Sequence, residues 1–127
     1  MAVKVKNSAM AKRSKIEKEL VFDIILFALG VTAVALLYKN NALLASLMLA
    51  GWLIAIKIWH KKEDIYIFVI AATAGTIAEA VAIKFGAWQY TNPTALGVPI
   101  WLPLLWGSAV VFIKRFSETV LRFTNEK

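Results

Sequence analysis

Cysteine is absent from the 127 residues of this chain, and histidine occurs once, as His60. Without cysteine the chain has neither a disulfide framework nor a thiolate metal site. His60 stands beside Lys61 and Lys62, a setting typical of a solvated connection between helices. We therefore expect no metal site and no other cofactor.

Acidic residues are also scarce, since eight Asp and Glu stand against fifteen Lys and Arg, which gives a net charge of +7. Hydrophobic residues make up 60% of the chain, and the mean hydropathy is +0.66. A soluble domain of this size needs more polar residues than that to cover its surface. The composition predicts a multi-pass protein of the cytoplasmic membrane.

Four hydrophobic runs are each close to the roughly 20 residues that cross a bilayer core. They cover about residues 20–38, 42–59, 65–85 and 95–113. We expect an all-α fold with one transmembrane domain over residues 1–127, built as a four-helix bundle. A basic tail at 1–14 and an interfacial segment at 114–127 would flank it.

The first span has two possible accounts. Ser14 and Glu17 form a capping-box pattern, which predicts that a retained helix begins near residue 15. A cleavable signal peptide is the alternative, with Ala33-Val34-Ala35 as the cleavage site. The hydrophobic run continues without a break to Tyr38, which favours the retained helix.

Positive charge is distributed unevenly among the ends of the expected spans. Thirteen of the fifteen Lys and Arg lie before the first span, at the inner end of the second or between it and the third, or after the fourth, and the other two are Lys39 and Lys84. Because Lys and Arg are retained in the cytoplasm, both termini are predicted inside. The three separate basic segments are typical of contact with anionic lipids and do not indicate a nucleic-acid partner.

Residues 86–107 crowd three tryptophans, a tyrosine and all three prolines between two hydrophobic helices. Asn92-Pro93 and Gly97 favour turns, so this stretch predicts an aromatic loop at the outer face, between helices three and four. Pro99 suits the first turn of helix four, and Pro103, one turn later, predicts a kink.

Glu79 is an acidic residue inside the third span, on the same helix face as Ala71 and Gly75. A carboxylate is costly to bury in a membrane, so it marks either a functional site or a buried polar pair. Counting from the expected span ends places three more residues at the same depth, which would form one polar layer: Thr32, Ser46 and Trp106. The purely structural alternative is a Glu79 bonded to Thr32, Tyr90 or a backbone carbonyl, without chemistry.

Asp23, the other acidic residue inside a span, lies near the inner end of the first helix. Lys57, Lys114 and Arg115 are expected at a similar level. We therefore interpret Asp23 as a partner in a juxtamembrane ion pair.

The order of Glu79, then Gly86-Ala87-Trp88-Gln89-Tyr90, then Gly97-Val98-Pro99 resembles membrane carotenoid-modifying proteins. Lycopene cyclase domains carry an acidic residue followed by Gly-x-Trp-x-Tyr and a later Gly-x-Pro-type segment, and carotenoid hydratases have a similar arrangement. Small uncharacterised polytopic membrane proteins are also similar. The resemblance covers about residues 79–107 and implies that Glu79 occupies the acidic position. The chain departs from cyclase domains at Trp101-Leu102-Pro103, where they favour acidic residues, and in having a single copy of the motif.

Two classes of function fit these features. In the first, the protein binds or modifies a long apolar, isoprenoid-like lipid near its outer face, and Glu79 serves as the catalytic acid or base or as a polar anchor. In the second, it is a structural or accessory subunit that forms oligomers with itself or with a membrane partner, without catalysis. The residues expected to bind the ligand of the first class are Thr32, Ser46, Trp88, Tyr90, Trp101 and Trp106.

Overall fold

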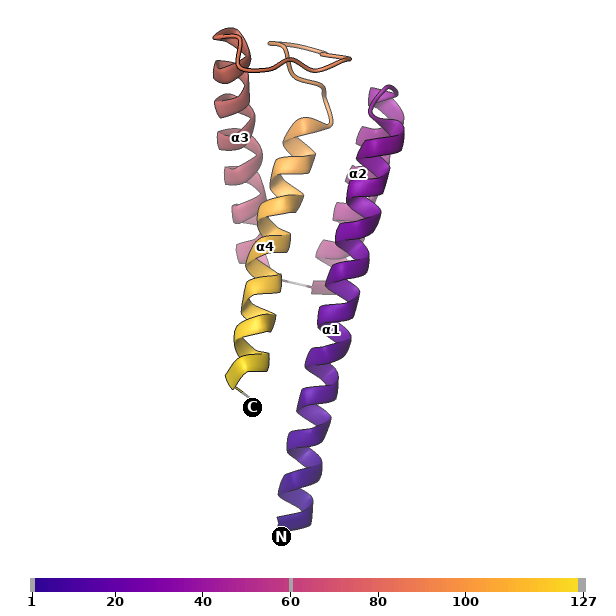
Figure 1. Ribbon diagram of the computed structural model, residues 1–127, viewed down its shortest axis with the longest axis vertical. Coiled ribbons are helices and arrows are strands. Elements are labelled where there is room, and N and C mark those ends of the chain that lie inside the picture. The colour runs from indigo at the N-terminus through magenta and orange to yellow at the C-terminus, as the bar shows by residue number, and fades with distance from the viewer. Residues whose placement is uncertain (1, 60, 126–127) are drawn as a thin grey trace. The chain divides into compact units, whose positions relative to one another are not determined.

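The computed structural model describes residues 2–59 and 61–125, which form four α-helices (Figure 1). The helices are α1 (Ala2–Leu37), α2 (Asn41–Trp59), α3 (Lys62–Lys84) and α4 (Leu102–Asn125). The predicted all-helical class is confirmed. Three helices, α1, α2 and α3, are long and apolar enough to cross a membrane, which suggests a membrane protein.

The start of α1 differs from the prediction. The helix begins at Ala2, so the expected start near residue 15 is wrong, and Ser14 lies exposed within the helix. The residues before Ser14 include no Gly or Pro and are mostly good helix formers, which explains the extension. Glu17 pairs with Arg13 one turn earlier, at 3.5 Å, as two residues on the same face of a helix do.

The start of α4 also differs. The fourth run was expected to span from residue 95, but Ala95 and Val98 pair as an isolated bridge and the helix begins only at Leu102. Leu96 and Gly97, with φ values of 52° and 80°, have backbone conformations that an α-helix excludes. Pro103 therefore lies in the first turn of α4, where its missing N–H is not needed, and not at a kink.

A third difference concerns the start of α3. Lys61 occupies the N-cap position without a side-chain cap hydrogen bond, and the helix begins at Lys62. Asp64, one residue before the expected start of this span at residue 65, lies buried inside the first turn of the helix. There its carboxylate is close to the positive end of the helix dipole.

The chain divides into two compact units, which we describe separately. The second unit, Gly30–Val111, contains two clusters of buried side chains. One consists of Leu44, Val98, Trp101 and Leu102. In the other, the Trp52 and Phe68 rings stack with centroids 4.1 Å apart, beside Val111.

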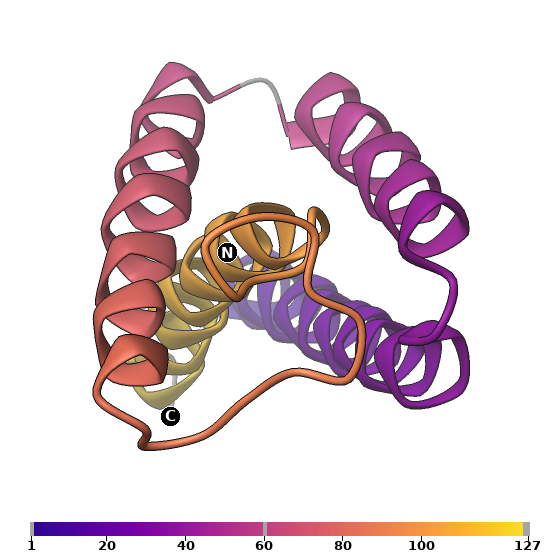
Figure 2. The same ribbon diagram turned by 90° about the horizontal axis from the view of Figure 1, so that it is seen from above.

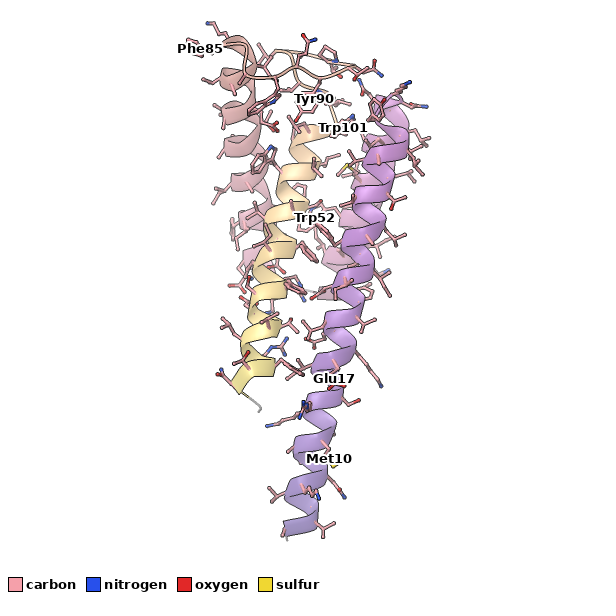
Figure 3. All side chains as sticks on the ribbon, viewed as in Figure 1. Met10, Glu17, Trp52, Phe85, Tyr90 and Trp101 are labelled. Atoms are coloured by element: carbon pink, nitrogen blue, oxygen red, sulfur yellow. The ribbon has the colours of Figure 1, made fainter. Side chains whose placement is uncertain are left out.

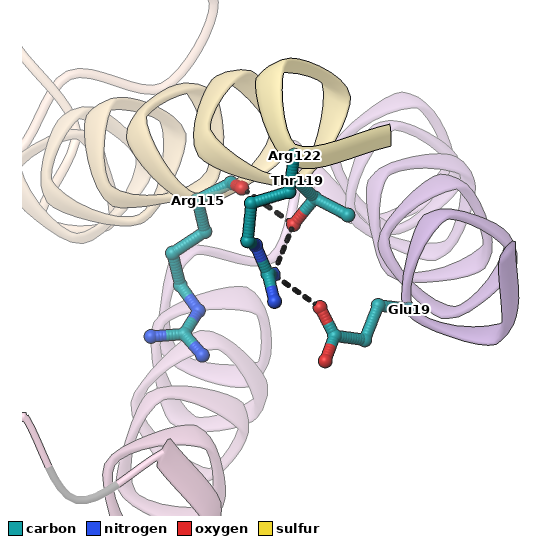
Figure 4. A network of polar contacts seen from close by, with 4 residues as sticks. All are labelled: Glu19, Arg115, Thr119 and Arg122. Atoms are coloured by element: carbon teal, nitrogen blue, oxygen red, sulfur yellow. Dashed lines mark hydrogen bonds and ion pairs between the residues drawn. The ribbon is translucent and has the colours of Figure 1, made fainter. Parts of the chain in front are cut away.

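The first unit joins α1 up to Leu29 with α4 from Phe112 onward. The Phe112 ring stacks between those of Phe27 and Phe116, at centroid distances of 5.2 and 5.6 Å. Arg122 bridges Glu19 of α1 and the Thr119 hydroxyl of α4 (Figure 4).

Asp23 is buried in this first unit. Arg115 and Arg122 are the cations that act on its carboxylate. Of the three expected partners, Arg115 attracts the Asp23 carboxylate, and Arg122 is a second cation that the sequence did not reveal; the ion pair itself stays a prediction.

Candidate functional site

The aromatic loop, residues 85–101, connects α3 to α4 (Figure 2). It contains no regular helix or strand, so side chains supply much of its hydrogen bonding. Asn41, the first residue of α2, donates to the Asn92 carbonyl at 2.8 Å and to the Thr94 hydroxyl at 3.2 Å. Its own side-chain oxygen accepts from Trp101 Nε1 at 3.1 Å. The Asn41 side chain therefore holds three residues of the loop by hydrogen bonds.

A second asparagine ties the loop to the turn between α1 and α2. The Asn92 side chain donates to the backbone carbonyl of Lys39. Thr94 adds an internal bond by accepting from the Ile100 amide at 3.1 Å. These contacts hold the loop against the end of α2 rather than leaving it free at the end of α3.

Glu79 lies on α3 and accepts two hydrogen bonds. The Tyr90 hydroxyl donates to Oε1 and Trp106 Nε1 donates to Oε2, both at 2.5 Å. The two donors come from the aromatic loop and from α4, so the carboxylate joins three parts of the chain. Of the alternatives that the sequence left open, the bond from Tyr90 is the one that the structure contains.

Gly75 makes this arrangement possible. It is buried one turn before Glu79, and a Cβ built on it would lie 2.2 Å from Cδ2 of Trp106. No side chain fits there without moving the indole. Gly75 and Glu79, which the sequence places on one helix face, therefore both meet Trp106 in the structure.

Tyr90 and Trp101 form an aromatic pair beside the carboxylate. Their rings meet edge to face with centroids 5.9 Å apart, and Figure 3 shows both side chains beneath the loop. Burial, together with the hydrogen bond to the negative Glu79 carboxylate, raises the pKa of the Tyr90 phenol well above its ordinary value. Tyr90 is therefore a neutral hydrogen-bond donor over the physiological pH range.

The remaining predicted site residues lie elsewhere. Thr32 and Ser46 are exposed on α1 and α2, and the Ser46 hydroxyl donates within its own helix to the Ala42 carbonyl at 2.7 Å. Trp88 is 49% exposed on the loop. The structure thus brings together Glu79, Tyr90, Trp101 and Trp106, while the predicted polar layer does not extend to Ser46.

Among the described residues, two hollows that adjoin the aromatic loop are of interest here. The first, which we call the aromatic hollow, is open to the outside and has a volume of about 280 Å³. Its wall includes Val34 and Tyr38 from the end of α1 and Tyr90, Pro99 and Trp101 from the loop. The second, the α3 groove, measures about 540 Å³ and lies between α3 and the turn at Leu96 and Gly97.

Sequence reasoning missed the residues that hold the loop, above all Asn41 and Thr94. Asn41 directly follows a tight turn, and Asn92 precedes a proline, so both stand where short polar side chains bond nearby backbone groups. This pattern predicts local turns, but it does not indicate that Asn41 bonds to Asn92, some fifty residues away. The pairing became visible only in three dimensions.

No metal-binding group of three or more His, Cys, Asp or Glu occurs within the described ranges 2–59 and 61–125. His60 lies outside those ranges. Comparisons of the chain with protein-family models, with curated proteins and with solved structures find no match.

Proposed function

We propose that the chain is an integral membrane protein that binds a long apolar lipid, isoprenoid or carotenoid-like, near the outer face of the membrane. The resemblance over residues 79–107 suggests the class of lipid. Glu79 is the polar anchor of this site, and the aromatic loop covers it.

Exposed apolar side chains support insertion into a bilayer. On α2 and α3 they include Leu53, Ile54, Val69 and Ile70, each more than half exposed. Many large apolar side chains exposed on long helices are unusual on soluble monomers and are normal where lipid tails cover the helices.

The aromatic hollow is the observation that carries the proposal for a lipid. Its volume of about 280 Å³ is too small for a whole long-chain lipid, so it takes one end of the molecule. Tyr90, whose hydroxyl is held by Glu79, and Trp101 form part of its wall. Rigid aromatic faces next to apolar Val34 and Pro99 suit an unsaturated hydrocarbon end group.

Glu79 acts on this ligand through Tyr90. Both carboxylate oxygens accept a hydrogen bond, so direct action on a ligand as an acid or base requires Tyr90 or Trp106 to move away first. The anchor role needs no such movement. It is therefore the role that we assign.

Lipid extraction from gently purified protein, followed by mass spectrometry, tests the proposal. We expect an isoprenoid lipid in the wild type and in Glu79→Gln, because the new amide still accepts from Trp106 and can donate to the Tyr90 oxygen. Glu79→Ala removes both contacts and should lose the lipid. Glu63→Gln, at the other end of α3, is the matched control and should retain it.

Two results would overturn the proposal. One is a wild-type protein that retains no lipid other than bulk phospholipid. The other is a Glu79→Ala protein that is folded yet keeps the same isoprenoid in the same amount. A Glu79→Gln protein that keeps the lipid in an altered chemical form would instead assign Glu79 a direct catalytic role.

The accessory-subunit function is the second candidate, and a specific observation favours it. Ala42, Ser46 and Ala50 form a stripe of small residues on α2, and all three are exposed. Small residues allow two helices to approach closely in lipid. If this function is correct, Ser46→Leu should dissociate an assembly in mild detergent, whereas the retained lipid should not change.

A further inference from the structure

The α3 groove is apolar along its length and charged at one end only. Ile77 and Val81 lie on its floor, and Lys84 follows them on the same face of the helix. Lys84 is exposed, and it takes part in no ion pair with any residue that the structure describes. The groove therefore offers a hydrocarbon-binding surface that ends at an unneutralised amine.

The position of Lys84 along α3 matches the level of lipid head groups. The apolar part of the helix begins at Ile65, and the rise from there to Lys84 is about 29 Å. This is close to the roughly 30 Å thickness of a bilayer hydrocarbon core. When α3 crosses the membrane, the amine lies at the interface and the rest of the groove lies among the acyl chains.

The turn that forms the other wall holds a strained residue. Leu96 has a φ of 52°, a conformation that non-glycine residues rarely adopt, and the residue is 84% exposed. Two backbone hydrogen bonds between Ala95 and Val98, of 2.9 and 3.2 Å, fix this turn. Gly97 brings it close to α3, because a Cβ there would lie 2.7 Å from Ile83. The strained backbone of this turn therefore places the apolar Leu96 side chain at the edge of the groove.

We infer that the α3 groove binds one anionic glycerophospholipid of the surrounding bilayer. The lipid phosphate pairs with Lys84, and one acyl chain lies along Ile77 and Val81 against Leu96. The groove shares no lining residue with the aromatic hollow, so this site is separate from the proposed isoprenoid site. Charge complementarity selects the head group, and the apolar floor takes any acyl chain.

Reconstitution into lipid nanodiscs tests the inference. The full chain is placed in discs with equal amounts of phosphatidylglycerol and phosphatidylcholine, extracted in mild detergent, and analysed for retained lipid by mass spectrometry. We expect the anionic lipid to be enriched about fivefold, the effect of one lysine near a membrane surface. Lys84→Gln should reduce the ratio to about one.

Lys39→Gln is the matched control. Lys39 is the other cation that the sequence assigns to the same membrane face, but its amine lies over the Tyr38 ring and does not line the groove. Its removal should leave the enrichment unchanged. Leu96→Gly should lower the total retained phospholipid severalfold, whereas Ala95→Gly, next to it in the turn, should not.

Equal retention of the two lipids by the wild type would overturn the inference. So would an equal loss of enrichment in Lys84→Gln and Lys39→Gln, since that pattern indicates general surface charge rather than a site. Either result leaves the isoprenoid proposal standing, because that proposal depends on variants of Glu79 and not of Lys84.

Discussion

At the scale of single residues, the site pairs the smallest side chain with the largest. Gly75 and Trp106 come from two helices, and the indole occupies the space that a side chain on Gly75 would need. The same indole donates to Glu79, so packing and hydrogen bonding depend on one contact. A substitution at Gly75 should therefore disturb the hydrogen bonding of Glu79 indirectly, by displacing Trp106.

We expect Gly75→Ala to destabilise the folded protein by about 1 to 3 kcal/mol, because the added methyl forces the Trp106 indole away from its position. Unfolding in mixed detergent micelles, followed by circular dichroism, measures the change. Gly51→Ala is the control, since nothing lies within 4 Å of a Cβ at Gly51. That helical substitution should be neutral or slightly stabilising. Equal effects of the two variants would contradict the role given to Trp106.

Glu79→Ala should cost about 1 to 3 kcal/mol for each donor left without an acceptor, namely Tyr90 and Trp106. Glu79→Gln should cost much less, because an amide can satisfy both partners. The same unfolding measurement compares them. Similar losses in the two variants would show that the negative charge, and not the pair of hydrogen bonds, stabilises the site.

Tyr90 gives the stability a dependence on alkaline pH. Its pKa is raised in the folded protein, so folding stabilises the protonated phenol. This contribution is fully present below the unfolded pKa of about 10, and it is lost as the pH rises from there toward the folded pKa. Tyr90→Phe should flatten the decline in stability above about pH 10, while Tyr66→Phe, exposed on α3, should not. Identical alkaline profiles for the two variants would refute this assignment.

At the scale of elements, the aromatic loop is held by side chains from the helices around it. Asn40 and Asn41 are adjacent asparagines whose side chains have different structural roles. The Asn40 side-chain oxygen accepts from the Leu43 amide at 3.1 Å and so caps α2, whereas Asn41 bonds the loop. The sequence alone does not distinguish the two.

Hydrogen–deuterium exchange should separate these tasks. Asn41→Ala should increase exchange across residues 92–101, because three loop groups lose their partner. Asn40→Ala should increase exchange in the first turn of α2, at a cost of about 1 kcal/mol, and leave the loop protected. Loop exposure in both variants would mean that α2 as a whole, rather than Asn41, holds the loop.

The helices were largely predictable from the sequence, and their ends were not. Hydrophobic runs identified α2 and α3 because apolar length is a property of composition. The capping box at Ser14 misplaced the start of α1, since the same residues are compatible with a helix interior. At the site, the spacing placed Glu79 and Gly75 on one helix face, but the bonds from Tyr90 and Trp106 depend on how the loop and α4 pack.

At the scale of the whole molecule, α4 runs back along α3 within the second unit. Trp106 of α4 packs on Gly75, and Val111 clusters with Phe68, so contacts move toward the start of α3 as α4 proceeds. From Leu102 to Lys114 the apolar part of α4 rises only about 18 Å. A fourth crossing by α4 therefore requires Lys114 and Arg115 to extend their charged ends to the inner interface.

Cysteine labelling in intact cells tests this topology, because the chain has no native cysteine. Lys61 and Gln89 are both exposed, one before α3 and one after it. The charge distribution predicts that an impermeant thiol reagent labels Gln89→Cys and leaves Lys61→Cys unlabelled until the membrane is broken. The opposite labelling pattern would mean that the protein has the reverse orientation in the membrane.

The hydrogen bonds that hold the aromatic loop join residues that are synthesised at different times. Lys39 and Asn41 leave the ribosome about fifty residues before Asn92 and Thr94, which bond to them. The anchor is therefore complete when the loop emerges, and the loop can dock as soon as α3 has formed. The hydrogen bonding of Glu79, by contrast, is complete only after Trp106 has been translated, because Trp106 is the later of its two donors in the sequence. Ribosome-bound chains that stop before α4 should hold a docked loop and an unfinished carboxylate site.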